Sequence, residues 1–216
     1  MENKITAAFR THKPNRKTLP DIAGAIEAAP IRSARYKRMG AFKAGSNILD
    51  VGCAWGAILL GLPDSVSYTG IDVNRASIRI ACDVFRDRGD FIHLNAKEPK
   101  YNPKGPEDSA EIELPFPDGS FDSVLCCSLF THFNRRDAVE NYLAEISRVL
   151  KVGGRLLSTW FRSPPNAWGG TDRRYAWKES TIEGAFLPGQ SWIWANEEKG
   201  KTTERDDQWH IVTVKR

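Results

Sequence analysis

Asp50, Gly52 and Gly56 lie close together where an apolar run of the sequence ends, and their spacing could form a ligand site. Glycines in a turn let the backbone approach a ligand closely because they carry no Cβ atom. A dinucleotide site would require glycines at two further positions, which Ala54 and Ala57 occupy in this chain. An acidic side chain at this turn favours a cationic ligand over a diphosphate. The spacing therefore predicts a small-ligand site that prefers positive charge.

Asp72 is a second acidic residue at the end of an apolar run, which covers residues 67–72. It lies about 20 residues beyond Gly52, the spacing at which a carboxylate accepts hydrogen bonds from ribose hydroxyls. Asn74 can cap the helix that follows, so Asp72 is not needed for that role. We therefore expect Asp72 to bind the ribose of a ligand.

Asp50 and Asp72 can act on the same ligand only if the strands that carry them end at the same edge of a sheet. Apolar, partly β-branched runs predict parallel strands at residues 47–51, 67–72, 91–94, 123–128 and 155–161. Helices are expected at residues 22–29, 31–39, 57–60, 75–88 and 138–150, and Pro30 is expected to separate the first two. Residues 191–195 and 208–214 predict a closing antiparallel hairpin. In an open α/β sheet, ligands bind beyond the carboxyl ends of the strands, where both acids are expected.

Two segments depart from the alternation of strands and helices. Residues 1 to about 17 are polar and basic and contain Pro14, so we expect a loosely ordered arm. Residues 97–113 are rich in proline, lysine, glutamate and glycine and are longer than a usual connection. We expect this segment to be either mobile or part of an active-site cover.

The stretch Asp50-Val51-Gly52-Cys53-Ala54-Trp55-Gly56 resembles motif I of the class I S-adenosylmethionine-dependent methyltransferases, with Ala54 in place of the middle glycine. The resemblance extends to the nonapeptide at residues 114–122 and to residues 148–154, where Val152 replaces a proline that is common in the family. It covers residues 46–161 and implies a Rossmann-like, doubly wound α/β fold. The sheet is expected to be mostly parallel and seven-stranded, with a C-terminal antiparallel hairpin.

The resemblance also implies a division of the chain. Residues 1–45 are expected to form an N-terminal arm and helical cap. Residues 46–216 are expected to form the S-adenosylmethionine-binding domain, with a lid or substrate segment near residues 162–190. The parts outside residues 46–161 would then choose the acceptor.

The same resemblance implies the residues that bind S-adenosylmethionine. Asp50, Gly52, Ala54 and Gly56 are expected at the methionine part of the cofactor. Asp72 is expected at the ribose, and Asn95 and Ala96 at the adenine, with which Asn95 can exchange hydrogen bonds. Ser128 and Leu129 are expected beside the sulfonium. The full set of expected cofactor-binding residues is Asp50, Gly52, Cys53, Ala54, Trp55, Gly56, Asp72, Val73, Asn95, Ala96, Ser128 and Leu129.

His132 is the candidate catalytic residue, because histidine titrates near neutral pH and could take a proton from a hydroxyl acceptor. The family often has histidine here without needing a base, and an amine or carboxylate acceptor would need only alignment with the methyl group. Aromatic residues on loops can line an acceptor pocket. The expected acceptor-binding residues are Thr131, Phe133, Trp168, Tyr175 and Trp177.

Composition narrows the function classes. The net charge is only +4 and its basic residues are spread along the chain, which disfavours a nucleic-acid surface. The four cysteines lack the spacing of a zinc site, so we expect buried reduced thiols and no metal ion. No apolar run could span a bilayer and no secretory signal is visible, so we expect a cytoplasmic protein.

These observations favour a metal-independent methyltransferase that modifies an oxygen or nitrogen of a small-molecule acceptor. One alternative is an RNA or protein methyltransferase. A nicotinamide-dependent dehydrogenase is a second alternative, and a module that binds the cofactor without turnover is a third.

Overall fold

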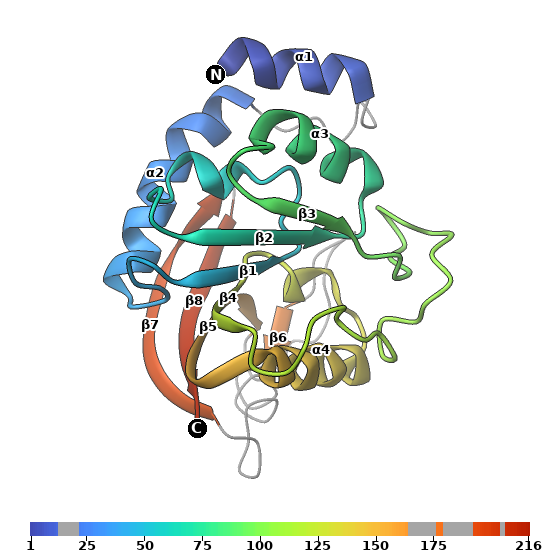
Figure 1. Ribbon diagram of the computed structural model, residues 1–216. Helices are drawn as coiled ribbons and strands as arrows, with labels where there is room; N and C mark the ends of the chain where they lie inside the picture. Colours follow the sequence, from blue (N-terminus) through green and yellow to red (C-terminus); the bar gives the residue numbers. More distant parts are fainter. Residues whose placement is uncertain (13–21, 164–175, 179–191, 204–205) are drawn as a thin grey trace.

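The computed structural model describes residues 1–12, 22–163, 176–178, 192–203 and 206–216 (Figure 1). Within these ranges the chain forms one α/β sheet with helices packed against it. The strands are β1 (Asn47–Val51), β2 (Ser67–Asp72), β3 (Asp90–His93), β4 (Phe121–Cys126), β5 (Leu150–Ser163), β6 (Ala176–Lys178), β7 (Trp192–Thr203) and β8 (Asp206–Lys215).

Seven of the described strands follow one another across the sheet in the order β3-β2-β1-β4-β5-β8-β7. The first five are parallel, whereas β8 runs antiparallel to β5 and β7 runs antiparallel to β8. The three-residue β6 pairs in parallel with the end of β5. The predicted doubly wound, mostly parallel sheet of seven strands and its C-terminal hairpin are therefore confirmed, and β6 adds a short further strand.

Helices cover both faces of this sheet. They are α1 (Glu2–His12), α2 (Ile22–Arg38), α3 (Arg75–Phe85) and α4 (Arg136–Val149), with the short 3-10 helices η2 (Ala57–Leu60) and η3 (Phe130–His132). Figure 1 shows α1 and α3 on the side of the sheet opposite to α4. The fold therefore has three layers, with the sheet in the middle.

Side chains alternate along each strand, so a single strand supplies both hydrophobic cores. Leu49 belongs to the core that contains Leu143 of α4, whereas its neighbour Ile48 belongs to the core that contains residues of α1, α2 and α3. Leu156 and Leu157 of β5 divide in the same way. Because both faces are buried, the central strands are continuous apolar runs in the sequence.

The N-terminal residues form a helix, so the prediction of a loosely ordered arm is wrong for residues 2–12. Ile5 and Phe9 lie four residues apart on one helical face, and both are buried. The helix packs on α3, where Lys4 Nζ donates to the Val84 carbonyl oxygen at 2.9 Å. A short apolar stripe is thus sufficient to order this polar segment once α3 offers a partner surface.

Helix α2 continues through Pro30, so the predicted break between two helices is also wrong. Proline in a helix interior removes a backbone donor and costs about 3 kcal/mol relative to alanine. Burial offsets this cost, because Ala29, Ser33 and Tyr36 form one buried helical stripe. Gly61 packs against the same turn so closely that a Cβ atom there would lie 2.4 Å from the Ala29 carbonyl oxygen. Tertiary packing therefore overrides the local signal of the proline.

Cys82 of α3 is exposed, so the prediction that this thiol is buried is wrong. The helix ends at Phe85 rather than at residue 88, and its buried side chains are Ile78, Ile80, Ala81, Val84 and Phe85. Position 82 lies outside that stripe. Cys53 and Cys126 are buried and Cys127 is partly buried, as the sequence predicts.

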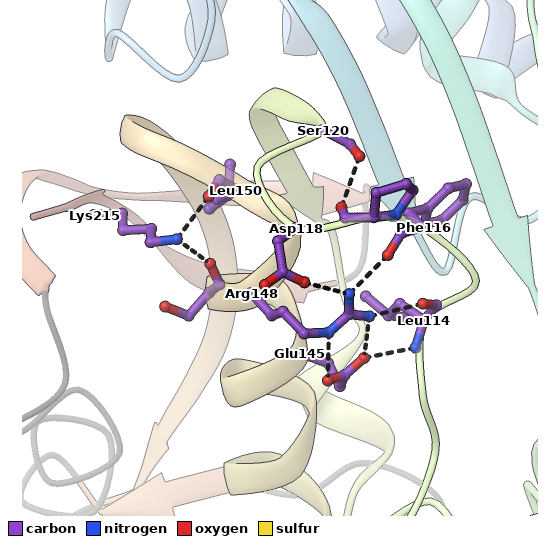
Figure 2. Close-up of polar contacts among 10 residues, drawn as sticks. Leu114, Phe116, Asp118, Ser120, Glu145, Arg148, Leu150 and Lys215 are labelled. Atoms are coloured by element: carbon purple, nitrogen blue, oxygen red, sulfur yellow. Dashed lines mark hydrogen bonds and ion pairs between the residues drawn. The ribbon is translucent and has the colours of Figure 1, made fainter.

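Arg148 of α4 anchors the turn that precedes β4 (Figure 2). Its guanidinium donates to the carbonyl oxygens of Leu114 at 2.8 Å and Phe116 at 2.7 Å, and to Asp118 Oδ1 at 3.0 Å. Glu145 Oε2 accepts from Arg148 Nη2 at 2.7 Å and from the Leu114 amide at 2.7 Å. The nonapeptide at residues 114–122 is therefore held to α4 by charge-assisted hydrogen bonds.

Candidate functional site

A cavity of about 490 Å³ lies at the carboxyl edge of the parallel strands. The segments after β1, β2, β3 and β4 line it, together with Phe9 of α1 and the first turns of α4. Ligands of open α/β sheets bind at this edge. The predicted site residues that form its wall are Gly52, Ala54, Trp55, Asp72, Val73, Ser128, Leu129, His132 and Phe133.

The loop after β1 turns sharply beside this cavity. Gly52 and Ala54 have φ angles of +80° and +51°. The amides of Gly52 and Cys53 donate to the Ile71 carbonyl oxygen of β2 at 2.8 and 3.0 Å. A Cβ atom on Gly52 would lie 3.2 Å from Leu129 Cδ1, so glycine admits the leucine side chain here. Ala54 adopts a left-handed conformation that glycine adopts without strain, which explains why motif I usually has glycine at this position.

Asp72 ends β2 with its carboxylate at the cavity wall. Oδ2 accepts from the Ala54 amide at 2.8 Å, and Oδ1 accepts from the Asn74 amide at 2.7 Å. Each carboxylate oxygen can accept a further hydrogen bond, so Asp72 can hold the loop and still accept from a ribose hydroxyl. Burial raises the pKa of Asp72 to about 6, although both amides favour the ionised form. Asn74 caps α3 as predicted.

Asp50 lies behind the loop and not at the cavity wall. Its side chain is buried, and Oδ2 accepts from the Tyr68 hydroxyl at 2.7 Å. Oδ1 is buried without a hydrogen-bond partner in the described part of the chain. Burial raises the pKa of Asp50 to about 7. Its expected contact with the methionine part of the cofactor stays a prediction.

Further predicted residues also lie behind the wall. At the expected adenine site, Ala96 is fully buried and Asn95 Oδ1 accepts from Asn102 Nδ2 at 3.2 Å. Leu94, Lys97 and Glu98 form the wall at this point instead. The predicted residues outside the described cavity wall, in addition to Asp50, are Cys53, Gly56, Asn95, Ala96 and Thr131.

His132 lies in η3 and lines the cavity. The ring of Tyr101 meets it edge-on, with 5.6 Å between the ring centroids. Phe133 packs against Tyr142 of α4 at 4.9 Å between centroids, and both side chains line the cavity. Mostly apolar walls with a few polar groups are typical of small-molecule sites.

Residues of the segment 97–113 form part of the wall, which agrees with the expectation of an active-site cover. Arg135 holds this segment, since its Nη1 donates to Asp108 Oδ1 at 3.0 Å and Oδ2 at 2.8 Å. Asn141 Nδ2 of α4 donates to the Ile112 carbonyl oxygen at 3.0 Å. The segment is therefore attached to α4 through Asn141 and to Arg135, the residue that precedes the helix.

Several wall residues lie outside the predicted site, among them Phe9, Tyr101, Arg135 and Tyr142. The sequence contains a signal for Phe9, because Ile5 and Phe9 share a helical face. Tyr142 falls in the apolar stripe of the predicted helix 138–150, so the pattern alone indicates a core residue. Tyr101 and Arg135 lie in or beside irregular segments, where no periodic pattern indicates which side chains face a ligand.

Trp168 and Tyr175 lie outside the described residues, as does the side chain of Trp177, whose backbone pairs in β6 with Arg162 of β5. Within the described ranges, no group of three or more His, Cys, Asp or Glu residues is arranged to hold a metal ion. None of the described helices combines the length and the apolar character that a membrane span requires.

Residues 49–158, which are 110 of the 216 residues, match the family model of a methyltransferase domain. The chain is 34% identical over 125 residues to phthiotriol/phenolphthiotriol dimycocerosates methyltransferase 1 of Mycobacterium ulcerans, covering 55% of this chain and 38% of the relative. It is 31% identical over 144 residues to 27-O-demethylrifamycin SV methyltransferase of Amycolatopsis mediterranei, covering 63% and 46%. The chain thus spans less than half the length of either relative.

The fold is similar to that of magnesium protoporphyrin IX methyltransferase from Synechocystis PCC 6803, whose crystal structure contains bound S-adenosylmethionine. The TM-score is 0.63 at 15% identity, and the match covers 98% of this chain and 91% of that one. The family match runs from β1 into β5, and therefore contains the motif I loop and Asp72. The chain accordingly belongs to the class I S-adenosylmethionine-dependent methyltransferases, and S-adenosylmethionine is its cofactor.

Proposed function

We propose that the protein transfers the methyl group of S-adenosylmethionine to an oxygen or nitrogen of a small molecule, with a hydroxyl oxygen as the favoured acceptor. The observation that carries this proposal is that Asp72 and His132 line the same cavity. The cavity volume of about 490 Å³ falls within the range of small-molecule sites. The name of the Amycolatopsis relative specifies an oxygen position of its acceptor, which supports oxygen over nitrogen.

The residues at the edge of the sheet fit the cofactor. Gly52 leaves space next to Leu129, and Asp72 offers a partly buried carboxylate to a ribose. When bound, S-adenosylmethionine supplies a methyl group on a positively charged sulfur. Asp50 and Asp72 contribute negative charge near the loop, which favours a cationic ligand when these carboxylates are ionised.

His132 acts in this proposal on the acceptor and not on the cofactor. Its ring would accept the proton of the acceptor hydroxyl. Bound S-adenosylmethionine would supply the methyl group, and its carbon–sulfur bond would break to release S-adenosylhomocysteine as the new bond to oxygen forms. Tyr101 packs against the ring of His132 and limits its orientations. Segment 97–113 covers the cavity, so that the acceptor oxygen competes with less water for the methyl group.

Titration calorimetry with S-adenosylhomocysteine tests cofactor binding. We expect the wild type to bind with a dissociation constant of roughly micromolar order, as is usual for enzyme ligands, and to give no signal with NADH. Asp72→Ala should abolish the binding. Asp64→Ala is the matched control, because Asp64 is an exposed acid that pairs with Arg88 away from the cavity. If the wild type did not bind S-adenosylhomocysteine, the proposal would be overturned. If Asp72→Ala bound it as tightly as the wild type does, the assignment of Asp72 to the ribose would be overturned.

Acceptor screening tests the reaction itself. The wild type is incubated with S-adenosylmethionine and panels of hydroxylated and amino small molecules, and formation of S-adenosylhomocysteine is measured. A module that only binds the cofactor would bind S-adenosylhomocysteine in calorimetry but would form none of it from S-adenosylmethionine with any of the small molecules. An RNA methyltransferase would instead bind polynucleotides with an affinity that falls steeply with salt.

A further inference from the structure

Ser128 has a left-handed backbone at the wall of the cofactor cavity. Its φ angle is +60°, and it follows β4 by two positions. Left-handed conformations are unfavourable for residues with a Cβ atom and persist only where surrounding contacts enforce them. Such residues concentrate at functional sites. The contacts that enforce this conformation are therefore of functional interest.

Three buried polar side chains contact Ser128. Its amide donates to Thr159 Oγ1 at 2.6 Å, and its carbonyl oxygen accepts from Thr131 Oγ1 at 2.7 Å. Its hydroxyl accepts from Gln208 Nε2 at 3.0 Å, and Gln208 Oε1 lies 3.3 Å from the same oxygen. Thr159, Thr131 and Gln208 are 0%, 2% and 2% exposed. Amide, carbonyl and hydroxyl of one residue are thus each fixed by a buried partner.

Gln208 reaches this position because of the sheet topology. β8 runs antiparallel to β5, so its first residues lie at the edge where the parallel strands end. Thr159 of β5 pairs with His210 of β8, two positions after Gln208. The C-terminal hairpin thereby places a polar side chain directly behind the cofactor cavity.

The conformation of Ser128 determines where the next residue lies. Leu129 lines the cavity, and its Cδ1 atom lies 3.2 Å from the position that a Cβ atom on Gly52 would occupy. Leu129 thus packs on the motif I loop at Gly52, where the loop has no side chain. A shift of the Ser128 backbone would move Leu129 against or away from the loop.

We propose that Gln208 is a positioning residue of the cofactor site, which acts by holding Ser128 in its left-handed conformation and thereby seating Leu129 against Gly52. This inference rests on the proposed function, because the affinity for the cofactor product is its readout. It assigns a role in the cofactor site to a residue outside the family match, which ends at residue 158.

Two substitutions of Ser128 separate conformation from contact. Ser128→Ala and Ser128→Gly both remove the hydroxyl and leave the Gln208 amide without that partner. Only glycine also removes the Cβ atom that makes the left-handed conformation unfavourable. A difference between these variants therefore reports on the backbone conformation and not on the lost hydrogen bond.

Calorimetry with S-adenosylhomocysteine is carried out on the wild type, Ser128→Ala, Ser128→Gly, Gln208→Ala and the double variant Ser128→Gly/Gln208→Ala. We expect Ser128→Ala and Gln208→Ala to weaken binding about tenfold, the ratio that one left-handed residue implies. Ser128→Gly should bind at least about threefold more tightly than Ser128→Ala, and the double variant should match Ser128→Gly. Circular dichroism melting of each variant confirms that it is folded.

Equal weakening by Ser128→Ala and Ser128→Gly would overturn the inference, because it would show that loss of the hydroxyl, and not the backbone conformation, determines the affinity. The inference would also be overturned if Gln208→Ala lowered the affinity by the same factor in the wild type and in Ser128→Gly, because Gln208 would then act independently of Ser128. Either outcome leaves the proposed function intact as long as the wild type binds. Failure of the wild type to bind would contradict the proposed function instead.

Discussion

Replacing Arg148 by alanine should destabilise the protein far more than removing a comparable arginine from the same helix. Arg148 donates to two backbone carbonyl groups and to Glu145. The side chains of Arg148 and Glu145 are only 25% and 15% exposed. Each carbonyl left without its donor costs about 1 kcal/mol, and loss of the partly buried Glu145 partner costs about 1 kcal/mol more. The contact with the exposed Asp118 contributes little. The total is about 3 kcal/mol.

Thermal melting followed by circular dichroism measures this effect. For a domain of this size, a loss of about 3 kcal/mol lowers the Tm by about 6–12 °C. Arg136→Ala is the matched control, because Arg136 and Glu140 form an ion pair on the exposed face of α4 with side chains 62% and 43% exposed. That pair contributes about 0.3–0.5 kcal/mol, so the control should melt within about 2 °C of the wild type.

The pH dependence of this difference provides a second check. The hydrogen bonds from Arg148 lower the pKa of Glu145 from its usual 4.5. A carboxyl group whose pKa is lowered by folding contributes stability above its unfolded pKa and loses that contribution as the pH falls through the lowered value. The gap in Tm between the wild type and Arg148→Ala should therefore narrow below pH 4.5. A gap no larger than that of Arg136→Ala at neutral pH would refute the reasoning.

Three further changes have defined outcomes. Binding of S-adenosylhomocysteine should weaken as the pH falls below about 6, because a ribose hydroxyl donates to the ionised carboxylate of Asp72, whose pKa burial raises to about 6. Calorimetry across pH measures this slope, and a slope that persists in Asp72→Asn would contradict the assignment. His132→Ala should lower the rate of methyl transfer about 10²- to 10⁴-fold while product affinity is retained, and a parallel loss of affinity would exclude a role confined to the acceptor. Ala54→Gly should raise the Tm by about 2–4 °C, because it removes strain of about 1 kcal/mol at a φ angle of +51°, whereas a lower Tm would show that the methyl group contributes to packing.

The residues that the sequence predicts well are those whose positions depend on local patterns. Asp72 is an example, because a strand ending and a spacing from Gly52 are both visible in the chain, and the structure places its carboxylate at the cavity wall. The two hydrophobic cores are a second example, since a sheet buried on both faces produces continuous apolar runs such as the one at β4.

The residues that the sequence predicts poorly depend on contacts between distant segments. Pro30 indicates a helix break, yet the close packing of Gly61 on Ala29 accompanies a continuous helix. The hydrogen bond that Asn95 Oδ1 accepts from Asn102, seven positions later, is likewise invisible in the local pattern, and its contact with the adenine stays a prediction. Gln208 shows the same limit, because its contact with Ser128 joins residues 80 positions apart.

The cavity wall combines parts with different origins. Gly52 and Asp72 come from strand ends within the family match, whereas Phe9 comes from α1, which lies outside it. Phe9 contacts Trp55 edge-on at 5.5 Å between ring centroids, so α1 adds a side chain to a wall that the β1 loop already defines. Substitution of a side chain on a separate helix need not alter the backbone of that loop. We therefore expect acceptor choice to change through α1, while the strand ends preserve cofactor binding.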